Sequence, residues 1–425
     1  MNKPKIYLDN AATTRMDEAV FEAMKPFFCE KFGNASSAHQ FGREAREAVE
    51  KARGQVANFL GCEPREIIFT SCATESNNLA IKGVVRKMRQ TLRQAQGDNF
   101  KPHIITSAIE HHCVLHACKA LEKDGLVEIT YLPVNKEGLV EVKEVEKAIK
   151  ENTVLISIMY ANNEIGTIQP IEEIEELIKK INKVRKQDDS STSSGQVYFH
   201  VDAVQAINYL DCNVEKLGAD FLSLSAHKFY GPKGVGALYI RKGTPIARIQ
   251  DGGEQEFKLR SGTYNTPGIV GLGKAISMAN YQSEETKRIK DLKDKLVANV
   301  LKNIPNCRLN GSVEKRLSNN ANFSFPGAEG EAILLSLDLE GIAVSTGSAC
   351  ASENLNPSHV LTALGLGPED SHSSIRFTLG KYTTEHDIDY VLEVLPRVID
   401  RLRKISGSGQ SKGEAKKKLP DDFGC

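Results

Sequence analysis

Strand-like and helix-like segments alternate through the first half of the chain, and this order constrains the fold more than any other feature. Apolar runs typical of buried strands recur at 66–71, 103–107, 127–134, 153–160, 197–202 and 221–226. Between them, apolar residues at three- and four-residue spacing predict helices over 39–60, 74–90, 112–123, 142–149 and 171–186. Helices that alternate with strands connect parallel strands, so the pattern predicts an α/β fold with a mostly parallel, wound sheet.

The second half of the chain has a different pattern. A long helical segment from about 268 to 303 precedes a strand-like run at 319–327, a helix near 329–340, a second strand-like run at 373–380 and a helix over 384–404. This order predicts a smaller α+β unit. The polar stretches 90–100 and 187–196 predict surface insertions, and 405–425 predicts a flexible tail.

Composition excludes several classes of protein. The chain of 425 residues has 55 basic and 55 acidic side chains, so no bulk charge favours nucleic acid or an anionic membrane. Its nine cysteines are odd in number and form no CxxC pair, which argues against a secreted disulfide framework. No apolar run is long enough to cross a bilayer, and residues 1–10 show no apolar signal core. We therefore expect a reduced, cytoplasmic protein that binds neither nucleic acid nor membrane.

Lys228 follows a predicted strand directly and precedes a glycine-rich turn, in the run SLSAHKFYGPKGVGALYI at 223–240. Parallel α/β sheets open their ligand crevice at the carboxyl ends of their strands. A lysine at such a place can bind a phosphate as a point charge, or it can form a Schiff base with a carbonyl cofactor such as pyridoxal phosphate.

The glycine-rich runs give little support to nucleotide binding. GPKGVG at 231–236 is followed by Ala237 and Leu238, where a P-loop needs lysine and serine or threonine. GVGALY at 234–239 and GLGKAI at 271–276 each lack the third glycine of a dinucleotide-binding fingerprint. For both runs a plain turn or hairpin is the favoured interpretation.

A pyridoxal phosphate enzyme needs an acid at the pyridine nitrogen, a group that stacks on the ring, a phosphate site and an anchor for the substrate carboxylate. Asp202, at the end of a predicted buried strand, is the candidate acid, and Gln205 could hydrogen-bond the ring oxygen. The ordinary alternative for Asp202 is a helix cap. Arg376 offers a planar fork for a carboxylate, although a lone arginine is more often a surface ion-pair partner.

The segment FTSCATESNNLA at 69–80 runs from a strand into a helix through small and hydroxylated residues. Free amides near Ala73 and Thr74, together with the positive end of the helix dipole, would attract a phosphate. An ordinary helix N-cap is an equally good interpretation of this segment alone.

Three histidines occur in AIEHHCVLHAC at 108–118. His111 follows a strand, and a neutral imidazole there could stack on a cofactor ring and move protons. His112 and His116 stand four residues apart on the next helix, which raises zinc as an alternative. The HExxH pattern and a second ligand cluster are both missing, so we expect no metal site.

Cys350 lies in VSTGSACASENLNPS at 344–358, a run of small and polar residues that predicts a mobile loop. An unperturbed cysteine is only about 3% thiolate at neutral pH, so use as a nucleophile requires a partner group or delivery to a site. An idle loop cysteine is the alternative.

Together these residues resemble a known family. The quoted motifs are YLDNAATT at 7–14, TESNN at 74–78, EHH at 110–112, NNEIG at 162–166, HVDAVQ at 200–205, SAHKFYGPKGVG at 225–236, RSGT at 260–263, STGSACAS at 345–352 and SSIRFTLG at 373–380. In this order, across about residues 5–405, they resemble the cysteine desulfurases of the IscS/NifS group, within the class V aminotransferases. The resemblance implies a fold type I pyridoxal phosphate enzyme that converts L-cysteine to L-alanine and leaves the sulfur as a persulfide on Cys350.

The resemblance also implies roles for single residues. Lys228 would form the Schiff base, His111 would stack on the ring, Asp202 would pair with the pyridine nitrogen and Gln205 with the ring hydroxyl. Phosphate contacts would come from Ala73, Thr74, Ser225 and His227, with Thr263 added by the second subunit. The substrate carboxylate would bind Asn163 and Arg376, and Asn163 would also contact the cofactor.

The family's architecture implies a large cofactor-binding domain over 15–262 and a small domain formed by 1–14 and 263–404, with the cysteine loop at 344–358. It further implies a homodimer with the site at the subunit interface, and sulfur delivery to an iron–sulfur scaffold or another acceptor protein. The tail 405–425, which ends in Cys425, is expected to be inert, although its terminal thiol could relay sulfur. A selenocysteine lyase, a cysteine sulfinate desulfinase and a non-catalytic dimeric scaffold stay open as alternatives.

Overall fold

The computed structural model describes residues 3–96, 101–188, 195–346 and 357–407. Cys350, Cys425 and most of the expected tail lie outside the described residues. None of the helices within these ranges is both long and apolar enough to span a bilayer.

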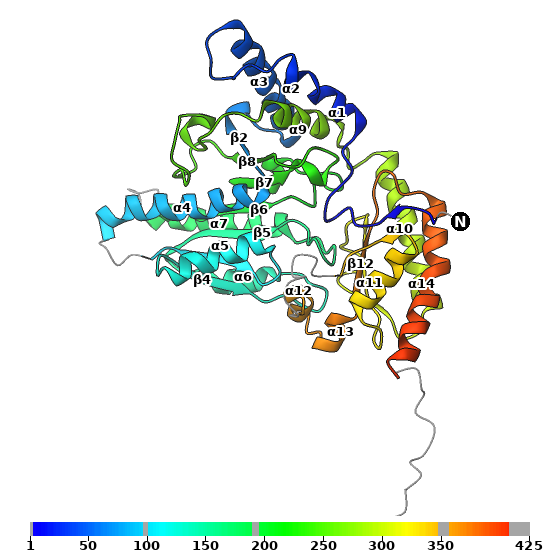
Figure 1. Ribbon diagram of the computed structural model, residues 1–425. Coiled ribbons are helices and arrows are strands. Elements are labelled where there is room, and N and C mark those ends of the chain that lie inside the picture. The colour runs from blue at the N-terminus through cyan, green and yellow to red at the C-terminus, as the bar shows by residue number, and fades with distance from the viewer. Residues whose placement is uncertain (1–2, 97–100, 189–194, 347–356, 408–425) are drawn as a thin grey trace, which may run out of the picture.

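A seven-stranded sheet forms the centre of the larger part of the molecule (Figure 1). Its spatial order is β2-β8-β7-β6-β5-β3-β4, and β8 alone runs antiparallel to both of its neighbours in the described sheet. The strands are β2 (Ile67–Thr70), β3 (His103–Ser107), β4 (Glu128–Leu132), β5 (Thr153–Met159), β6 (Tyr198–Asp202), β7 (Phe221–Ser225) and β8 (Gly236–Ile240). The expected α/β fold with a mostly parallel sheet is confirmed.

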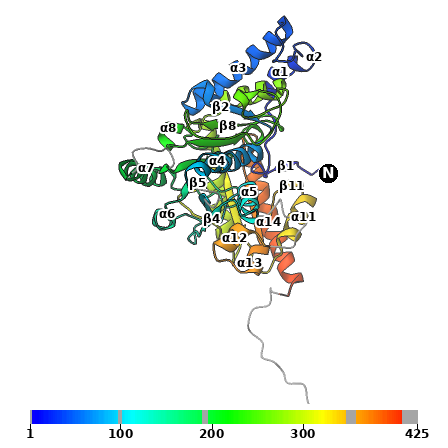
Figure 2. The same cartoon turned by 90° about the vertical axis from the view of Figure 1, so that its left-hand side faces the viewer.

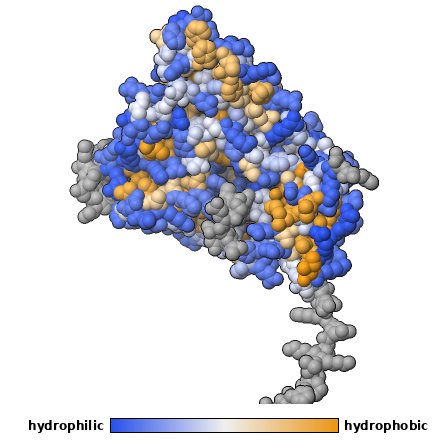
Figure 3. Space-filling view, viewed as in Figure 1, coloured by the Kyte–Doolittle hydropathy of each residue, from blue (hydrophilic) through white to orange (hydrophobic). Residues whose placement is uncertain are grey.

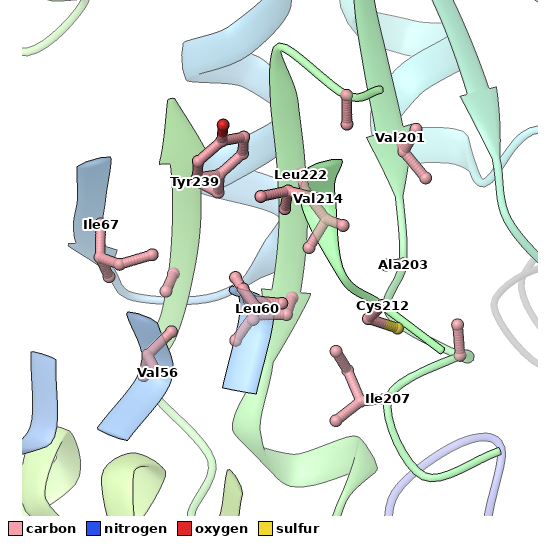
Figure 4. Packing of buried hydrophobic residues seen from close by; sticks show 14 of the residues in the cluster. Val56, Leu60, Ile67, Val201, Ala203, Ile207, Cys212, Val214, Leu222 and Tyr239 are labelled. Carbon is pink, nitrogen blue, oxygen red and sulfur yellow. The ribbon is translucent and has the colours of Figure 1, made fainter. Parts of the chain in front are cut away.

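Helices cover both faces of this sheet (Figures 1 and 2). One face packs against α4 (Ala73–Gln96) and α5 (His112–Lys123), and the other against α3 (Gln40–Leu60), α7 (Ile171–Asp188) and α9 (Thr266–Met278). Successive strand side chains point to opposite faces. Ile67 therefore packs on the α3 side, where Figure 4 shows it with Val56 and Leu60, and Ile68 packs on the α4 side.

The shorter elements of this part connect or flank the sheet. They are α1 (Glu18–Met24), α2 (Pro26–Cys29), α6 (Val142–Ala148) and α8 (Val214–Leu217). The run GPKGVG leads through the expected turn into β8, which begins at Gly236, and Gly234 adopts φ +80° in this turn, a value that favours glycine.

The smaller part has its own core. A three-stranded antiparallel sheet of β12 (Ser374–Thr378), β10 (Asn320–Ser324) and β9 (Arg308–Leu309) packs against α10 (Glu284–Asn303), α11 (Gly330–Leu339) and α14 (Glu385–Ile405). The N-terminal strand β1 (Ile6–Tyr7) pairs with β11 (Ile342–Ala343), so the start of the chain joins this part. Two short helices, α12 (His359–Ala363) and α13 (Pro368–His372), precede β12.

Helix α9 corrects one interpretation made from the sequence. The run GLGKAI, interpreted as a turn, instead lies inside this helix, within the helical segment expected from about 268. Its glycines allow close packing there, because an added Cβ would approach the Met24 sulfur to 2.5 Å at Gly271 and the Ala52 Cα to 2.7 Å at Gly273. The core of the large sheet therefore includes the buried side chains of α9.

On the face shown in Figure 3, apolar surface is visible over α1 and α2 and over α11, among other places. Phe21 and Phe28 are 47% and 58% exposed on α1 and α2, and Leu335 and Leu339 are 62% and 72% exposed on α11. Patches of this kind commonly mark contacts with other proteins.

Candidate active site

A cavity of about 400 Å³ opens at the carboxyl ends of β5, β6 and β7, where the smaller part of the molecule meets the sheet. It collects most of the residues singled out from the sequence: Ala73, Thr74, His111, Asn163, Asp202, Gln205, Ser225, His227, Lys228 and Arg376. These residues lie as far as 303 positions apart in the chain, from Ala73 to Arg376, so only the tertiary fold brings them together.

Lys228 ends a short 3₁₀ turn, Ala226–Lys228, that follows β7 directly. Its ammonium nitrogen donates to the carbonyl oxygens of Ala11 and Ala12, at 2.5 and 2.8 Å. Gln205 Nε2 also donates to the Ala11 oxygen, at 3.1 Å. The N-terminal segment therefore fixes the position of the amine inside the cavity.

Asp202 is the last residue of β6, and its buried side chain lines the cavity. Oδ2 accepts from Asn77 Nδ2 at 2.7 Å, and Oδ1 accepts from the Val204 amide at 3.0 Å. Burial raises the pKa of Asp202, while the two hydrogen bonds and the Lys228 charge act in the opposite direction. An acid in this position is poised to share a proton with a basic ring nitrogen.

The start of α4 and the end of β7 bring together groups that are suited to bind an anion. Helix α4 begins at Ala73, so its free amides and dipole face the cavity. Ser225 Oγ is buried and has no hydrogen-bond partner among the described residues. Because an unpaired buried hydroxyl is costly, Ser225 indicates a bound ligand with acceptor oxygens, as a phosphate has.

His227 and His111 are both neutral imidazoles. Burial first, then the charges of Lys228 and Lys233, lower the pKa of His227 to about 4. Burial and then Lys228 lower the pKa of His111 to about 4. His111 caps α5, since its Nδ1 accepts from the Cys113 amide at 3.2 Å, and this bond holds the ring at the cavity wall.

Further histidines surround His111. His112 lies 5.1 Å from His116 and 4.6 Å from His359, measured between ring centroids. Despite this proximity, no group of three or more histidine, cysteine or carboxylate side chains within the described ranges is arranged to hold a metal ion.

Arg376 projects into the cavity from β12 of the smaller part. Its Nη2 pairs with Asp9 Oδ1 at 2.8 Å, and its Nη1 donates to the Asn163 carbonyl at 2.9 Å. Nε is buried and has no partner within the described part of the chain. A guanidinium that is 3% exposed and incompletely satisfied is suited to bind a carboxylate.

Two buried carboxyl groups were not assigned a role from the sequence, although both lie in quoted motifs. Burial raises the pKa of Glu110 to about 8, although hydrogen bonds from Ser107 and the Met159 amide act in the opposite direction. The charge of Asp202 adds to the increase. Burial also raises the pKa of Glu164 to about 7, although a hydrogen bond from Ser358 acts in the opposite direction. The position of a glutamate in a strand or motif does not show whether its carboxyl group is enclosed, so the sequence pattern alone could not identify Glu110 and Glu164.

The flanks of the loop expected to hold the catalytic thiol are attached to this cavity. On one side the Ser345 and Arg376 backbones exchange hydrogen bonds. On the other, Ser358 Oγ donates to Glu164 Oε2 at 2.5 Å, and His359 Nε2 lies 2.9 Å from the Glu110 carbonyl. Cys350 itself lies outside the described residues, between two anchored ends.

Thr263 does not line the cavity of its own chain; it is exposed and follows Gly262, which adopts φ +117°. Every site residue that was predicted from the sequence and lies within the described ranges therefore lines the cavity, except Thr263.

Residues 6–391 match the aminotransferase class-V family model. The chain is 53% identical to cysteine desulfurase IscS of Dictyoglomus turgidum, with 95% of this chain and 97% of the relative covered. It is 50% identical to cysteine desulfurase IscS of Methanosarcina thermophila, with 94% and 93% covered.

Solved structures agree with these relatives. A NifS-like protein superposes with a TM-score of 0.82 at 42% identity, covering 93% of this chain and 99% of that one. The structure titled SspA in complex with cysteine superposes with a TM-score of 0.74 at 37% identity, covering 90% and 100%. The chain belongs to the class-V aminotransferase family and, within it, to the cysteine desulfurases of the IscS/NifS group.

Proposed function

We propose that the protein is a pyridoxal phosphate-dependent cysteine desulfurase, which converts L-cysteine to L-alanine and transfers the sulfur to Cys350. The observation that supports this most directly is the placement of Lys228, Asp202 and the unpaired Ser225 hydroxyl around one cavity at the strand ends.

The residues present fit the cofactor. Lys228 would bind its aldehyde carbon, Asp202 its pyridine nitrogen and Gln205 its ring hydroxyl, while His111 would stack on the ring. Ala73, Thr74, Ser225 and His227 would hold the phosphate. When bound, pyridoxal phosphate supplies an electron sink for charge that develops at the substrate Cα.

The chain's own groups would then act on L-cysteine. Arg376 and Asn163 orient its carboxylate, so that the Cα hydrogen faces Lys228 Nζ. The lysine amine takes this proton and later returns one, because its position between strand end and N-terminal segment keeps it within the cavity. Neutral His111 is available for a second proton transfer.

Sulfur transfer requires a thiolate at the substrate sulfur. The Cys350 thiolate gives an electron pair to that sulfur and forms an S–S bond, while the Cβ–S bond breaks and its pair stays on the substrate carbon. Protonation of that carbon completes L-alanine, and Cys350 holds a persulfide. The anchored flanks at Ser345 and Ser358 support delivery of the loop to the cavity mouth.

Two partners belong to this proposal. A second copy of the chain would contribute Thr263 to the phosphate site, which its exposure outside its own cavity supports. A sulfur acceptor, such as an iron–sulfur scaffold protein, would receive the sulfur from Cys350. The exposed apolar side chains on α11 offer one contact surface for such proteins.

The test is mass spectrometry of the purified protein after addition of L-cysteine. We expect an added sulfur atom on Cys350, and the same spectra check Cys425. Cys350→Ala should abolish sulfide release while the cofactor absorbance stays. Full activity of Cys350→Ala would refute the persulfide mechanism and favour a lyase that needs no protein thiol.

A further inference from the structure

Two arginine–glutamate pairs close the edge of the large sheet at β2. This strand is the last in the described sheet, with β8 on its inner side. On its outer side, the Ile67 carbonyl accepts from Arg53 Nη1 at 2.6 Å, and the Phe69 amide donates to Glu256 Oε2 at 2.8 Å. Groups at alternate residues of a strand face the same side. The pairs therefore satisfy backbone groups that a further strand would otherwise bind.

The same row of contacts continues to the start of α4. The Ser71 amide, two residues after Phe69, donates to Glu75 Oε2 at 2.7 Å. Glu75 Oε1 in turn accepts from Arg260 Nε at 2.8 Å. The second pair therefore holds the turn that leads from the sheet edge to the proposed phosphate site.

The first pair is deeply buried. Arg53 and Glu256 are 1% and 3% exposed, and two hydrogen bonds join them, at 2.9 and 2.8 Å. The Arg53 guanidinium also lies 4.7 Å from the centre of the Phe69 ring. A buried pair with this bidentate geometry fixes the relative positions of α3, β2 and the segment that carries Glu256.

Glu256 and Arg260 belong to one strained segment. Glu256, Phe257 and Lys258 adopt φ angles of 47°, 56° and 72°, in the left-handed region that non-glycine residues avoid. Such backbone conformations are strained, so this one persists only where contacts on both sides impose it. The two ion pairs supply these contacts.

The charge of Glu75 matters because of where it lies. It is in the first turn of α4, one residue after Thr74, where the helix dipole attracts anions. Burial raises the pKa of Glu75, but hydrogen bonds from Arg260 and Ser71 outweigh this and lower it. An ionised carboxylate here would repel a phosphate dianion unless a cation neutralises it.

We propose that Arg53, Glu75, Glu256 and Arg260, here called the edge clamp, position the Ser71–Thr74 turn, and that Arg260 neutralises Glu75 so that the turn can bind the cofactor phosphate. The inference rests on the proposed function, because the anion is the phosphate of pyridoxal phosphate. These four are positioning residues, since they act through the turn.

The experiment measures binding of pyridoxal 5′-phosphate and of pyridoxal, which lacks the phosphate, to the cofactor-free full-length protein. Arg260→Gln should raise the Kd for pyridoxal 5′-phosphate about tenfold or more, the loss expected for a charge-assisted contact. The Kd for pyridoxal should change less than about twofold. Adding Glu75→Gln to Arg260→Gln should restore most of the lost affinity, because it removes the unneutralised carboxylate.

Arg397→Gln is the matched control, since Arg397 pairs with Glu393 on the exposed face of α14, far along the chain from the site. It should leave both dissociation constants unchanged. Equal weakening for pyridoxal and its phosphate, or no rescue by Glu75→Gln, would overturn the edge clamp. Failure of the proposed function has a different signature: the unmodified protein would then bind no pyridoxal 5′-phosphate and release no sulfide.

Discussion

The cavity has two sides that are built in different ways. The floor, consisting of Asp202, Ser225 and Lys228, lies at the ends of adjacent strands of the large sheet. The wall consists of His359 and Arg376, which come from later in the chain. His359 begins α12, and Arg376 lies on β12 of the smaller part.

This difference separates two tasks. The floor holds buried groups suited to a cofactor, and their spacing follows from the spacing of the strands. The wall holds the cation suited to a substrate carboxylate and the flank of the cysteine loop. Variants of the floor should therefore change the cofactor spectrum and kcat, whereas variants of the wall should change KM and leave the spectrum intact.

The strongest test of the floor is Lys228→Ala. Loss of the amine removes both the covalent link to the cofactor and the group that moves the Cα proton, so kcat should fall by about 10³-fold or more. Borohydride should no longer bleach a visible absorbance band. Retention of a bleachable band in this variant would show that another amine holds the cofactor.

Asp202→Asn tests the floor with a smaller change. The amide is nearly isosteric and can keep one bond with Asn77, but it cannot carry the negative charge that pairs with a protonated ring nitrogen. We expect kcat to fall by about 10²-fold, within the range found when one stabilising group is removed. Steady-state kinetics and the absorbance maximum provide the measurement, and an unchanged kcat would remove Asp202 from the mechanism.

Arg376→Lys tests the wall. Lysine keeps the charge but loses the planar fork that contacts Asp9 and the Asn163 carbonyl. The KM for L-cysteine should rise about tenfold or more while kcat changes less than about threefold. A shift of the cofactor absorbance in this variant would contradict the division between wall and floor.

Glu110 joins the two sides, because its carboxyl accepts from the Met159 amide at 2.9 Å and its carbonyl contacts His359. Its pKa is raised from 4.5 to about 8. Between these values the folded state keeps the proton and the unfolded state loses it, so this group lowers stability as pH rises, by up to about 1.4 kcal/mol per pH unit.

Glu110→Gln should remove that dependence, since glutamine imitates the protonated acid and does not titrate. Chemical denaturation between pH 5 and pH 8 should then show a flatter stability profile than the unmodified protein. Identical slopes for the two proteins would show that Glu110 is already ionised at neutral pH.

Local patterns predicted much of this molecule. Strand runs such as 153–160 and 221–226 alternate with amphipathic helices, and this order alone specifies a wound sheet with ligand groups at its strand ends. Lys228 and Asp202 could be found in this way because each directly follows or ends an apolar run.

The packing of α9 could not be predicted in this way. Its apolar face is compatible with either core, and close contacts at Gly271 and Gly273 decide that it joins the large sheet. The bond between Asn77 and Asp202 joins residues 125 positions apart, and no periodicity specifies it.

The sequence by itself therefore determined the fold class, the order of elements and the residues at the strand ends, because these depend on short-range hydrophobic periodicity. Only the tertiary structure decided which carboxyl groups are enclosed and how Arg53 and Arg260 close the sheet edge. Burial and pairing are properties of groups that the fold brings together from distant parts of the chain, and they set the charges on which the proposed chemistry depends.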